Sequence, residues 1–240
     1  MKEVRKAILK PADIAYLIDA SVLKLDTSYE DVQALIDACK KYKFGCAFAW
    51  PGYYELLSKE LKGTATAFGT SLSFPSGQET TFIKVAQAHY FTSLGAAEVD
   101  MVMNVGWLKS KRYGEVLDDI KAVRFACRDT SLKVIIEAML LSDEEITKAC
   151  ELVAEAGADY VKSGTGFSSA PTSIHHVEVM KNAIQDRIKL KVAGGVRDLN
   201  TLLQMYKRGA DRFGIGLSSA IKIMEEANAR PDGIPVASVD

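Results

Sequence analysis

Eight short apolar segments alternate with longer amphipathic segments along this chain of 240 residues. Each short segment has the composition of a buried β-strand, and the longer segments repeat apolar residues at helical spacing. Strands that alternate with helices predict a parallel sheet, and eight of them favour a closed (β/α)8 TIM barrel over a doubly wound sheet of roughly five or six strands. The expected strands are residues 18–23, 46–50, 64–73, 98–104, 132–138, 160–163, 190–193 and 212–216.

Helix signals fill the intervals between these strands, at residues 29–41, 79–94, 113–127, 143–156, 175–184 and 199–207. Thr27 with Glu30, and Ser142 with Glu145, fit the spacing of capping boxes. The sequence shows no linker or low-complexity tract, so we expect a single domain over residues 1–240. Residues 1–17 are expected to form a helix over the bottom or rim of the barrel, and residues 229–240, which contain Pro and Gly, a loose tail.

Polar residues inside the strands favour a barrel. Val99 and Met101 alternate with Glu98 and Asp100 in one expected strand. Successive side chains of a strand point to opposite faces, so in a barrel the apolar set packs against the helices and the polar set faces the interior. A doubly wound sheet would bury these charges under helices on both faces.

Charge and composition exclude several classes of protein. The sequence has 30 Lys and Arg against 31 Asp and Glu, a net charge of −1, which argues against a nucleic-acid or polybasic membrane partner. No apolar run approaches the ~18–20 residues of a membrane span, and the first residues lack a signal-peptide core. The 4 Cys and 3 His show no metal-binding spacing. We therefore expect a cytoplasmic protein with reduced thiols and no metal site.

Two lysines, Lys162 and Lys191, stand inside strand-like segments separated by one β/α unit. Lysine is depleted in strands and is rarely fully buried without a partner. A lysine in a low-dielectric site beside a second cation loses proton affinity and becomes a neutral amine that attacks carbonyl compounds. This pattern predicts Schiff-base chemistry on Lys162, with Lys191 lowering its pKa. The alternative is two lysines at strand ends that reach solvent.

Carboxylates and a hydroxyl occupy corresponding places on other strands. Asp100 is a candidate for proton transfer through a water, or else a strand-end ion pair with a lysine. Glu137 is a candidate catalytic group or a structural partner for a lysine or an arginine. Asp19 and Ser21 are candidate ligands of substrate hydroxyls, or else parts of a turn or cap.

Glycine-rich turns follow the last three expected strands. In barrels of this kind the loops after strands seven and eight often bind phosphate through backbone N–H groups at a helix start, and glycine lets the backbone approach an anion closely. A phosphate or hydroxyl-rich substrate is therefore expected here, bound by Thr165, Gly166, Gly194, Gly195, Arg197, Gly214 and Gly216.

In these motifs, from residue 18 to about residue 220, the chain resembles the deoxyribose-phosphate aldolase family, class I aldolases of the (β/α)8 fold. The resemblance implies that Lys162 is the Schiff-base lysine, Lys191 the pKa-lowering lysine and Asp100 the proton-relay acid, with no metal or cofactor. It implies that acetaldehyde forms an enamine on the lysine and adds to D-glyceraldehyde 3-phosphate, giving 2-deoxy-D-ribose 5-phosphate, a reaction that cells usually run toward cleavage. The matching segments are residues 98–104, 132–137, 156–162, 165–167, 194–197 and 212–214.

The chain also departs from the family pattern. Phe48 stands where the family commonly has Cys, and Ala20 replaces a bulkier residue. In the family, a pair of hydroxyl residues after the last strand helps to hold the phosphate, and here Gly216 and Leu217 stand at those two positions. Ser218 and Ser219 come two positions later in the chain, where they could cap a helix. Three hypotheses follow: a deoxyribose-phosphate aldolase, a class I aldolase with another donor or an unphosphorylated acceptor, and a non-catalytic sugar-phosphate binder. Exposed barrel helices often pair, which allows a homodimer.

Overall fold

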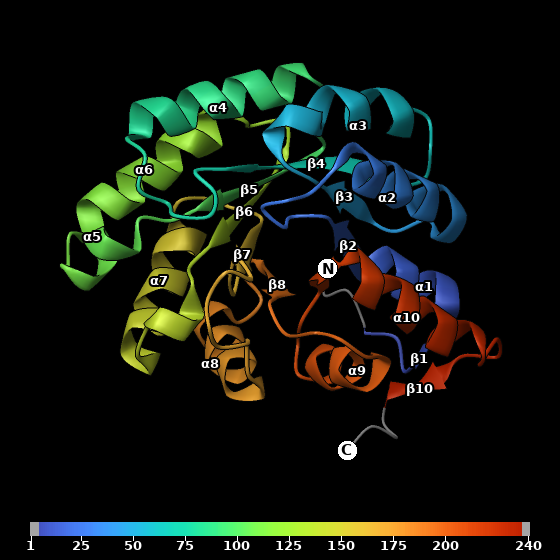
Figure 1. Ribbon diagram of the computed structural model, residues 1–240. Coiled ribbons are helices and arrows are strands. Elements are labelled where there is room, and N and C mark those ends of the chain that lie inside the picture. Colours follow the sequence, from blue (N-terminus) through green and yellow to red (C-terminus); the bar gives the residue numbers. More distant parts are fainter. Residues whose placement is uncertain (1–4, 237–240) are drawn as a thin grey trace.

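A computed structural model describes residues 5–236, whose centre is a closed barrel of eight parallel strands (Figure 1). All eight strands expected from the sequence are present, in the expected order, so the predicted (β/α)8 fold is confirmed. The barrel closes where Ile18 of the first barrel strand lies opposite Phe213 of the last. The strands are β2 (Ile18–Ser21), β3 (Cys46–Phe48), β4 (Ala67–Leu72), β5 (Glu98–Val102), β6 (Ser131–Ile135), β7 (Tyr160–Lys162), β8 (Lys189–Ala193) and β9 (Arg212–Gly216).

Helices form a ring around this barrel (Figure 1). Six of them match the expected helices to within a few residues, whereas α3 and α5 have no expected counterpart because they are too short to show a clear periodicity. The helices of the ring are α2 (Tyr29–Tyr42), α3 (Tyr54–Leu61), α4 (Thr81–Ser93), α5 (Val105–Lys109), α6 (Tyr113–Ala126), α7 (Asp143–Glu155), α8 (Ile174–Ile184), α9 (Leu199–Lys207) and α10 (Leu217–Asn228), with single 3₁₀ turns at Pro51–Tyr53 and Ala138–Leu140.

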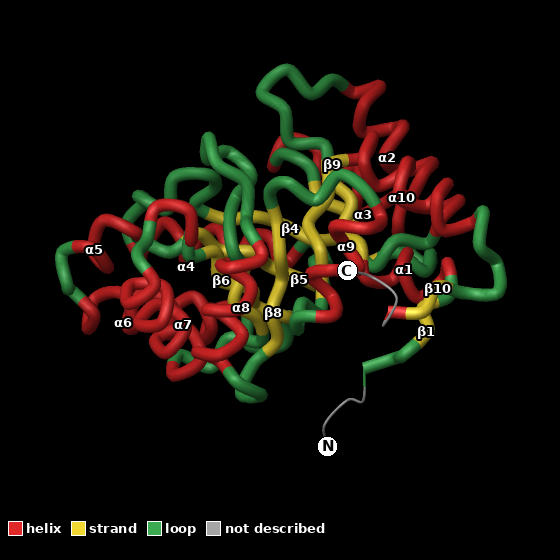
Figure 2. The backbone as a smooth tube through the Cα atoms, turned by 90° about the horizontal axis from the view of Figure 1, so that it is seen from below, coloured by secondary structure: helices red, strands yellow, loops and turns green. Residues whose placement is uncertain are grey.

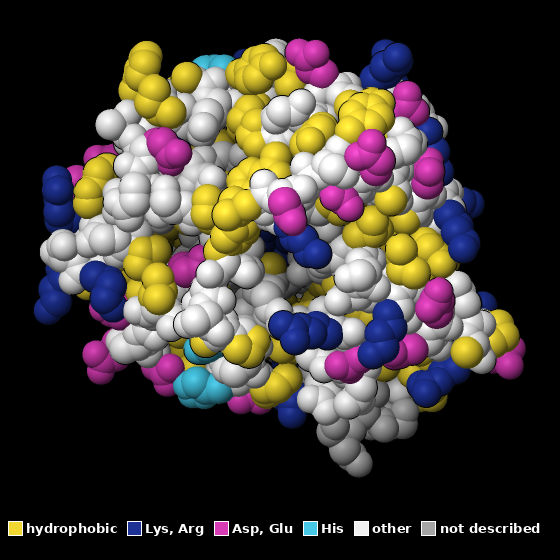
Figure 3. Space-filling model, in the orientation of Figure 1, with side chains coloured by type: hydrophobic (Ala, Val, Ile, Leu, Met, Phe, Trp, Pro, Cys, Tyr) yellow, Lys and Arg dark blue, Asp and Glu magenta, His cyan; other side chains and the backbone are white. Residues whose placement is uncertain are grey.

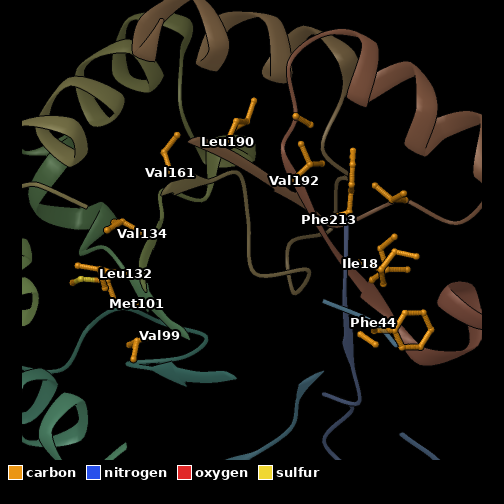
Figure 4. Packing of buried hydrophobic residues seen from close by; sticks show 14 of the residues in the cluster. Ile18, Phe44, Val99, Met101, Leu132, Val134, Val161, Leu190, Val192 and Phe213 are labelled. Atoms are coloured by element: carbon orange, nitrogen blue, oxygen red, sulfur yellow. The ribbon is translucent and has the colours of Figure 1, made fainter. Parts of the chain in front are cut away.

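The two faces of the strands differ as predicted. Figure 4 shows apolar side chains of successive strands, among them Val99, Met101 and Leu190, between the barrel and the helices, where they are buried. Burial of each such side chain contributes roughly 1.5–3 kcal/mol to folding. The alternate residues, including Asp100 and Lys191, are also buried but lie inside the barrel, where they form ion pairs. The barrel interior is therefore charged rather than apolar.

Both ends of the chain differ from the expectation. The N-terminal helix is shorter than residues 1–17: α1 is Pro11–Leu17, because Pro11 fits the first turn of a helix, and Ile8–Leu9 form a short strand, β1. The expected loose tail is wrong up to residue 236, where the described chain ends. Within it, β10 (Ile234–Pro235) pairs with β1, and Ile234 is buried (Figure 2). Residues 1–4 and 237–240 lie outside the described part of the chain.

One helix start is shifted from the expected position. Ser28, not Thr27, is the N-cap of α2, and its capping box is completed by Asp31 rather than Glu30. The capping box between Ser142 and Glu145 at the start of α7 is confirmed.

Between residues 5 and 236, no helix combines the length and the apolar character needed to cross a membrane.

The carboxyl ends of the barrel strands open onto one face of the molecule. Several long loops stand along the upper edge of the view in Figure 2, and they surround the opening. At the opposite end, α1 lies at the rim beside α10 (Figure 1), and the N–H of Gly45 donates to the backbone carbonyls of Ala15 and Ile18. Figure 3 shows a hollow at the centre of the open face, with Lys and Arg side chains beside it.

Candidate active site

The hollow is a pocket of about 570 Å³ at the carboxyl ends of the strands. This size is typical of small-molecule sites. Two candidate residues, Asp100 and Glu137, do not line it, and Asp100 lies fully buried beneath its floor. The expected residues that line the pocket are Asp19, Ser21, Lys162, Thr165, Gly166, Lys191, Gly194, Gly195, Arg197, Gly214 and Gly216.

Lys162 and Lys191 lie side by side in the barrel. They are direct neighbours in the register of β7 and β8. Their Nζ atoms lie 2.8 Å and 2.7 Å from the same oxygen, Oδ2 of Asp100. Both line the pocket, but the side chain of Lys162 is 7% exposed and that of Lys191 only 1%, so Lys162 is the more accessible of the two. The expected grouping of these three residues is therefore present, and the alternative of two solvent-facing lysines is wrong.

Below the lysine pair, a network of ion pairs fills the barrel. Asp19 accepts hydrogen bonds from Lys133 through Oδ2 and from Arg212 through Oδ1, and its Oδ2 also pairs with Lys191. Glu98 pairs with Lys133 and with Arg212. Both oxygens of Asp19 are thus occupied by cations, which favours a role in holding Lys191 over binding a substrate hydroxyl. Glu98 was expected to face the barrel interior but not to belong to the site. Lys133 and Arg212 were not expected there, although each shows the signal used for Lys162, a charge inside a strand.

The charges of this network do not balance when every group is ionised. Its members are three carboxylates and four basic side chains: Asp19, Glu98, Asp100, Lys133, Lys162, Lys191 and Arg212. Lys133, Lys191 and Arg212 each contact two carboxylates, whereas Lys162 contacts only Asp100, which it shares with Lys191. An uncompensated buried charge is costly, so the network is balanced when Lys162 is neutral.

The pKa values of these groups agree with this charge balance. Burial, and then the charge of Lys191, lower the pKa of Lys162 to about 8 despite the opposing attraction of Asp100. Burial would raise the pKa of Asp100, but the ammonium groups of Lys162 and Lys191 outweigh it and hold the value at about 2. The pKa of Lys133 is raised because the attraction of Asp19, Asp100 and Glu98 outweighs burial. At pH 7 about a tenth of Lys162 is therefore neutral, compared with about one part in 3,000 for an ordinary lysine.

Asp100 retains a free acceptor atom. Its Oδ1 is buried and has no hydrogen-bond partner in residues 5–236, whereas Oδ2 accepts from both lysines. A buried carboxylate oxygen without a donor is costly and is a feature of functional sites. This atom can take up a proton beside Lys162.

Glu137 has a structural role that differs from the expected one. Its carboxylate accepts the backbone N–H of Thr165, at 3.2 Å and 3.4 Å to its two oxygens, rather than pairing with a lysine or an arginine. Gly164 leaves room for this contact, because a Cβ there would lie 3.1 Å from Oε1 of Glu137 and 2.3 Å from Cε of Met139. Glu137 thus fixes the turn after β7, directly beyond Lys162.

The other end of the pocket can bind an anion. Lys24 and Arg197 line it together with Ser218 and Ser219 in the first turn of α10. The backbone of Gly194 and Gly195 has positive φ values of 91° and 95°, which glycine adopts most easily. The N-cap of α10 is Gly216, without a side-chain cap, so Ser218 and Ser219 face the pocket instead of capping the helix. Lys24 was not expected in the site, and the two serines were expected only to cap the helix.

No cluster of three His, Cys, Asp or Glu side chains in the described residues is arranged to hold a metal ion. A partly neutral lysine at the floor of a pocket suits an enzyme that reacts with carbonyl compounds through an imine, and aldolases are one class of such enzymes.

The comparisons with known proteins give the family. Residues 9–225 match the DeoC/LacD family aldolase, and the chain belongs to this family. A deoxyribose-phosphate aldolase of Clostridium tetani is 42% identical over 216 residues, covering 90% of this chain and 99% of its own. Among solved structures, the deoxyribose phosphate aldolase of Aeropyrum pernix, described as tetrameric, superposes with a TM-score of 0.83 at 27% identity, covering 92% of this chain and 93% of its own. An aldolase designated QR15 superposes with a TM-score of 0.86 at 33% identity, over 91% of this chain and 97% of its own.

Proposed function

We propose that the protein cleaves 2-deoxy-D-ribose 5-phosphate to D-glyceraldehyde 3-phosphate and acetaldehyde, and forms it in reverse, through a Schiff base on Lys162. The observation that carries this proposal is the unbalanced network, in which Lys162 is the one cation without a carboxylate of its own and is more exposed than Lys191, the other lysine of the network that lines the pocket. A non-catalytic sugar-phosphate binder would have no use for a neutral lysine.

In the synthetic direction the lone pair of Lys162 attacks the carbonyl carbon of acetaldehyde, and uptake of a proton with loss of water leaves a protonated imine. A proton leaves the adjacent methyl carbon, directly or through a water, and Oδ1 of Asp100 is the free acceptor for it. The resulting enamine forms a carbon–carbon bond to the aldehyde of the acceptor, whose oxygen takes up a proton. Water then hydrolyses the imine and releases the sugar. Nζ of Lys191 lies 2.5 Å from Oδ2 of Asp19 and 2.7 Å from Oδ2 of Asp100, beside the reacting groups.

We further propose that the acceptor's phosphate lies between Arg197, the turn at Gly194–Gly195 and the start of α10. Two cationic side chains and free backbone N–H groups suit a dianion there. Gly216 and Leu217 supply no hydroxyl to this end of the pocket. This departure favours the second candidate, a class I aldolase on the same lysine whose acceptor carries no phosphate.

Borohydride trapping tests the chemistry. Reduction in the presence of acetaldehyde should label Lys162 alone, as read by peptide mass spectrometry. The initial labelling rate should rise about tenfold per pH unit below pH 8 and level off above it, because only the neutral amine attacks and the pKa of Lys162 is about 8. Labelling by acetone or dihydroxyacetone but not by acetaldehyde would mean that the donor is a ketone. No labelling of Lys162 by any carbonyl compound would contradict the mechanism.

Arg197→Ala tests the acceptor. For D-glyceraldehyde 3-phosphate we expect KM to rise about 10- to 100-fold with a smaller change in kcat, because a charge-assisted hydrogen bond contributes about 1.5–3 kcal/mol. Unphosphorylated D-glyceraldehyde should be affected little. The exposed Arg128→Ala serves as the control. Equal losses for both aldehydes would show that Arg197 does not bind the phosphate, and a native preference for the unphosphorylated aldehyde would support the second candidate.

We also propose cytoplasmic residence, which the four free and buried cysteines support, and self-association as a homodimer. Support for a dimer comes from aromatic side chains exposed on two neighbouring helices, Phe82 (78%) and Tyr90 (52%) on α4 and Phe125 (74%) on α6. Aromatic residues are enriched at protein interfaces.

A further inference from the structure

The aromatic ring of Phe48 lies inside the charged barrel. Phe48 ends β3, is 3% exposed and lines the floor of the pocket. Its ring centroid lies 4.3 Å from Nζ of Lys191 and 5.7 Å from Nζ of Lys133. The side chain therefore packs against two ammonium groups, which is unusual for a residue whose only task is to fill space.

The barrel makes room for this ring at Gly69 on the neighbouring strand β4. A Cβ at position 69 would lie 2.5 Å from Cζ of Phe48 and 2.6 Å from Sγ of Cys46, closer than real Cβ atoms approach. The backbone of Gly69 is not in the left-handed region, so space rather than conformation requires glycine there. The ring is thus fitted to this place.

The ring gives the two lysines of the pair unequal surroundings. An ammonium group has three N–H donors. For Lys191, two carboxylates, Asp19 and Asp100, and the face of Phe48 surround the group. Among the described residues, Lys162 has one carboxylate partner and no aromatic ring over its Nζ. The face of an aromatic ring carries partial negative charge and attracts a cation most strongly where water is excluded.

We propose that Phe48 is a positioning residue that keeps the proton of the lysine pair on Lys191, and so leaves Lys162 as the neutral amine. The ring acts by attracting the Lys191 ammonium and by excluding water from it. The proposal rests on the Schiff-base function proposed above. The charged groups that face the pair are Asp19 from β2, Glu98 and Asp100 from β5, Lys133 from β6 and Arg212 from β9.

The test measures how the rate of borohydride trapping at Lys162 depends on pH. In Phe48→Leu the midpoint should move up from about 8 by about half a unit to one unit, because Lys191 holds its charge less firmly and Lys162 regains protons. Site-specific replacement of Phe48 by 3,4,5-trifluorophenylalanine nearly keeps the shape of the ring but weakens its negative face, and should move the midpoint in the same direction.

Phe91→Leu is the matched control, since Phe91 is an equally buried aromatic residue on α4, outside the barrel, and its loss should leave the midpoint unchanged. An unmoved midpoint in both Phe48 variants, or a shift in Phe48→Leu but none in the fluorinated protein, would overturn the proposal. If Lys162 of the wild-type protein is never labelled, the proposed function fails, and this inference fails with it. Because the fluorinated protein retains the native shape, the test holds even if Phe48→Leu folds poorly.

Discussion

Lys162→Leu should abolish turnover and yet make the protein more stable. Loss of the nucleophile removes the covalent route, so kcat should fall by roughly 10⁴-fold or more. The pKa of Lys162 is about 8 in the folded protein and near 10.5 when unfolded, so the unfolded state binds more protons between these values. Stability therefore rises with pH through this window, and at pH 7 the buried lysine lowers it by up to about 3 kcal/mol.

Replacement by leucine removes this cost and leaves three cations for three carboxylates. Chemical denaturation at pH 7 should show a higher free energy of unfolding for Lys162→Leu than for the wild type, and the difference should shrink as the pH approaches 10.5. The exposed lysine variant Lys222→Leu is the control for both measurements. Substantial turnover in Lys162→Leu would exclude this lysine as the nucleophile, and a pH-independent difference in stability would exclude its lowered pKa.

Lys191→Leu should cut turnover severely and move the pH optimum upward. Without Lys191, Lys162 becomes the only ammonium bound to Asp100, and the network again has three cations for three carboxylates. The pKa of Lys162 then rises from about 8 because the repulsion by Lys191 is gone, while burial continues to hold it below the value of an ordinary lysine. The rising limb of kcat/KM against pH should shift upward by about one unit, which lowers the neutral fraction of Lys162 at pH 7 about tenfold.

The conservative variant Lys191→Arg separates charge from shape. Arginine keeps a cation beside Asp100, so the rising limb of kcat/KM against pH for Lys191→Arg should stay close to that of the wild type. This should hold even if the bulk of arginine lowers kcat. Thermal unfolding of each variant checks that the barrel is intact. An unchanged pH profile in Lys191→Leu would show that Lys191 does not set the protonation of Lys162.

The fold could be predicted largely from the sequence, because the strands carry two signals at once. In β5 the apolar residues Val99 and Met101 mark the face toward the helices, and Asp100 between them marks the interior. Short elements gave no such signal: α3 has only 8 residues and α5 only 5. The ends of the chain were mispredicted because pairing of β1 with β10 depends on a contact across the whole sequence.

The lysine pair could be predicted because its two residues are charged, lie in strands and are separated by a single β/α unit. The rest of the network could be recognised only with the barrel closed, since Asp19 of β2 meets Lys133 of β6 across the interior. Phe48 stands out in the sequence only as a departure from the family's Cys, and its charged surroundings could not be predicted, because an apolar residue in a strand is expected to pack against apolar neighbours. Its contact with Lys191 exists only because the interior is charged.

The antiparallel pair β1–β10 joins the beginning and the end of the described chain near the amino end of β9, where Arg5 pairs with Asp211. Ile8 and Pro235 are partners in this pair, so a short peptide bridge there could close the chain into a ring. New ends could then be opened in an exposed turn such as residues 110–112, between α5 and α6. A circularly permuted protein of this kind would keep every strand of the barrel and its buried lysine pair.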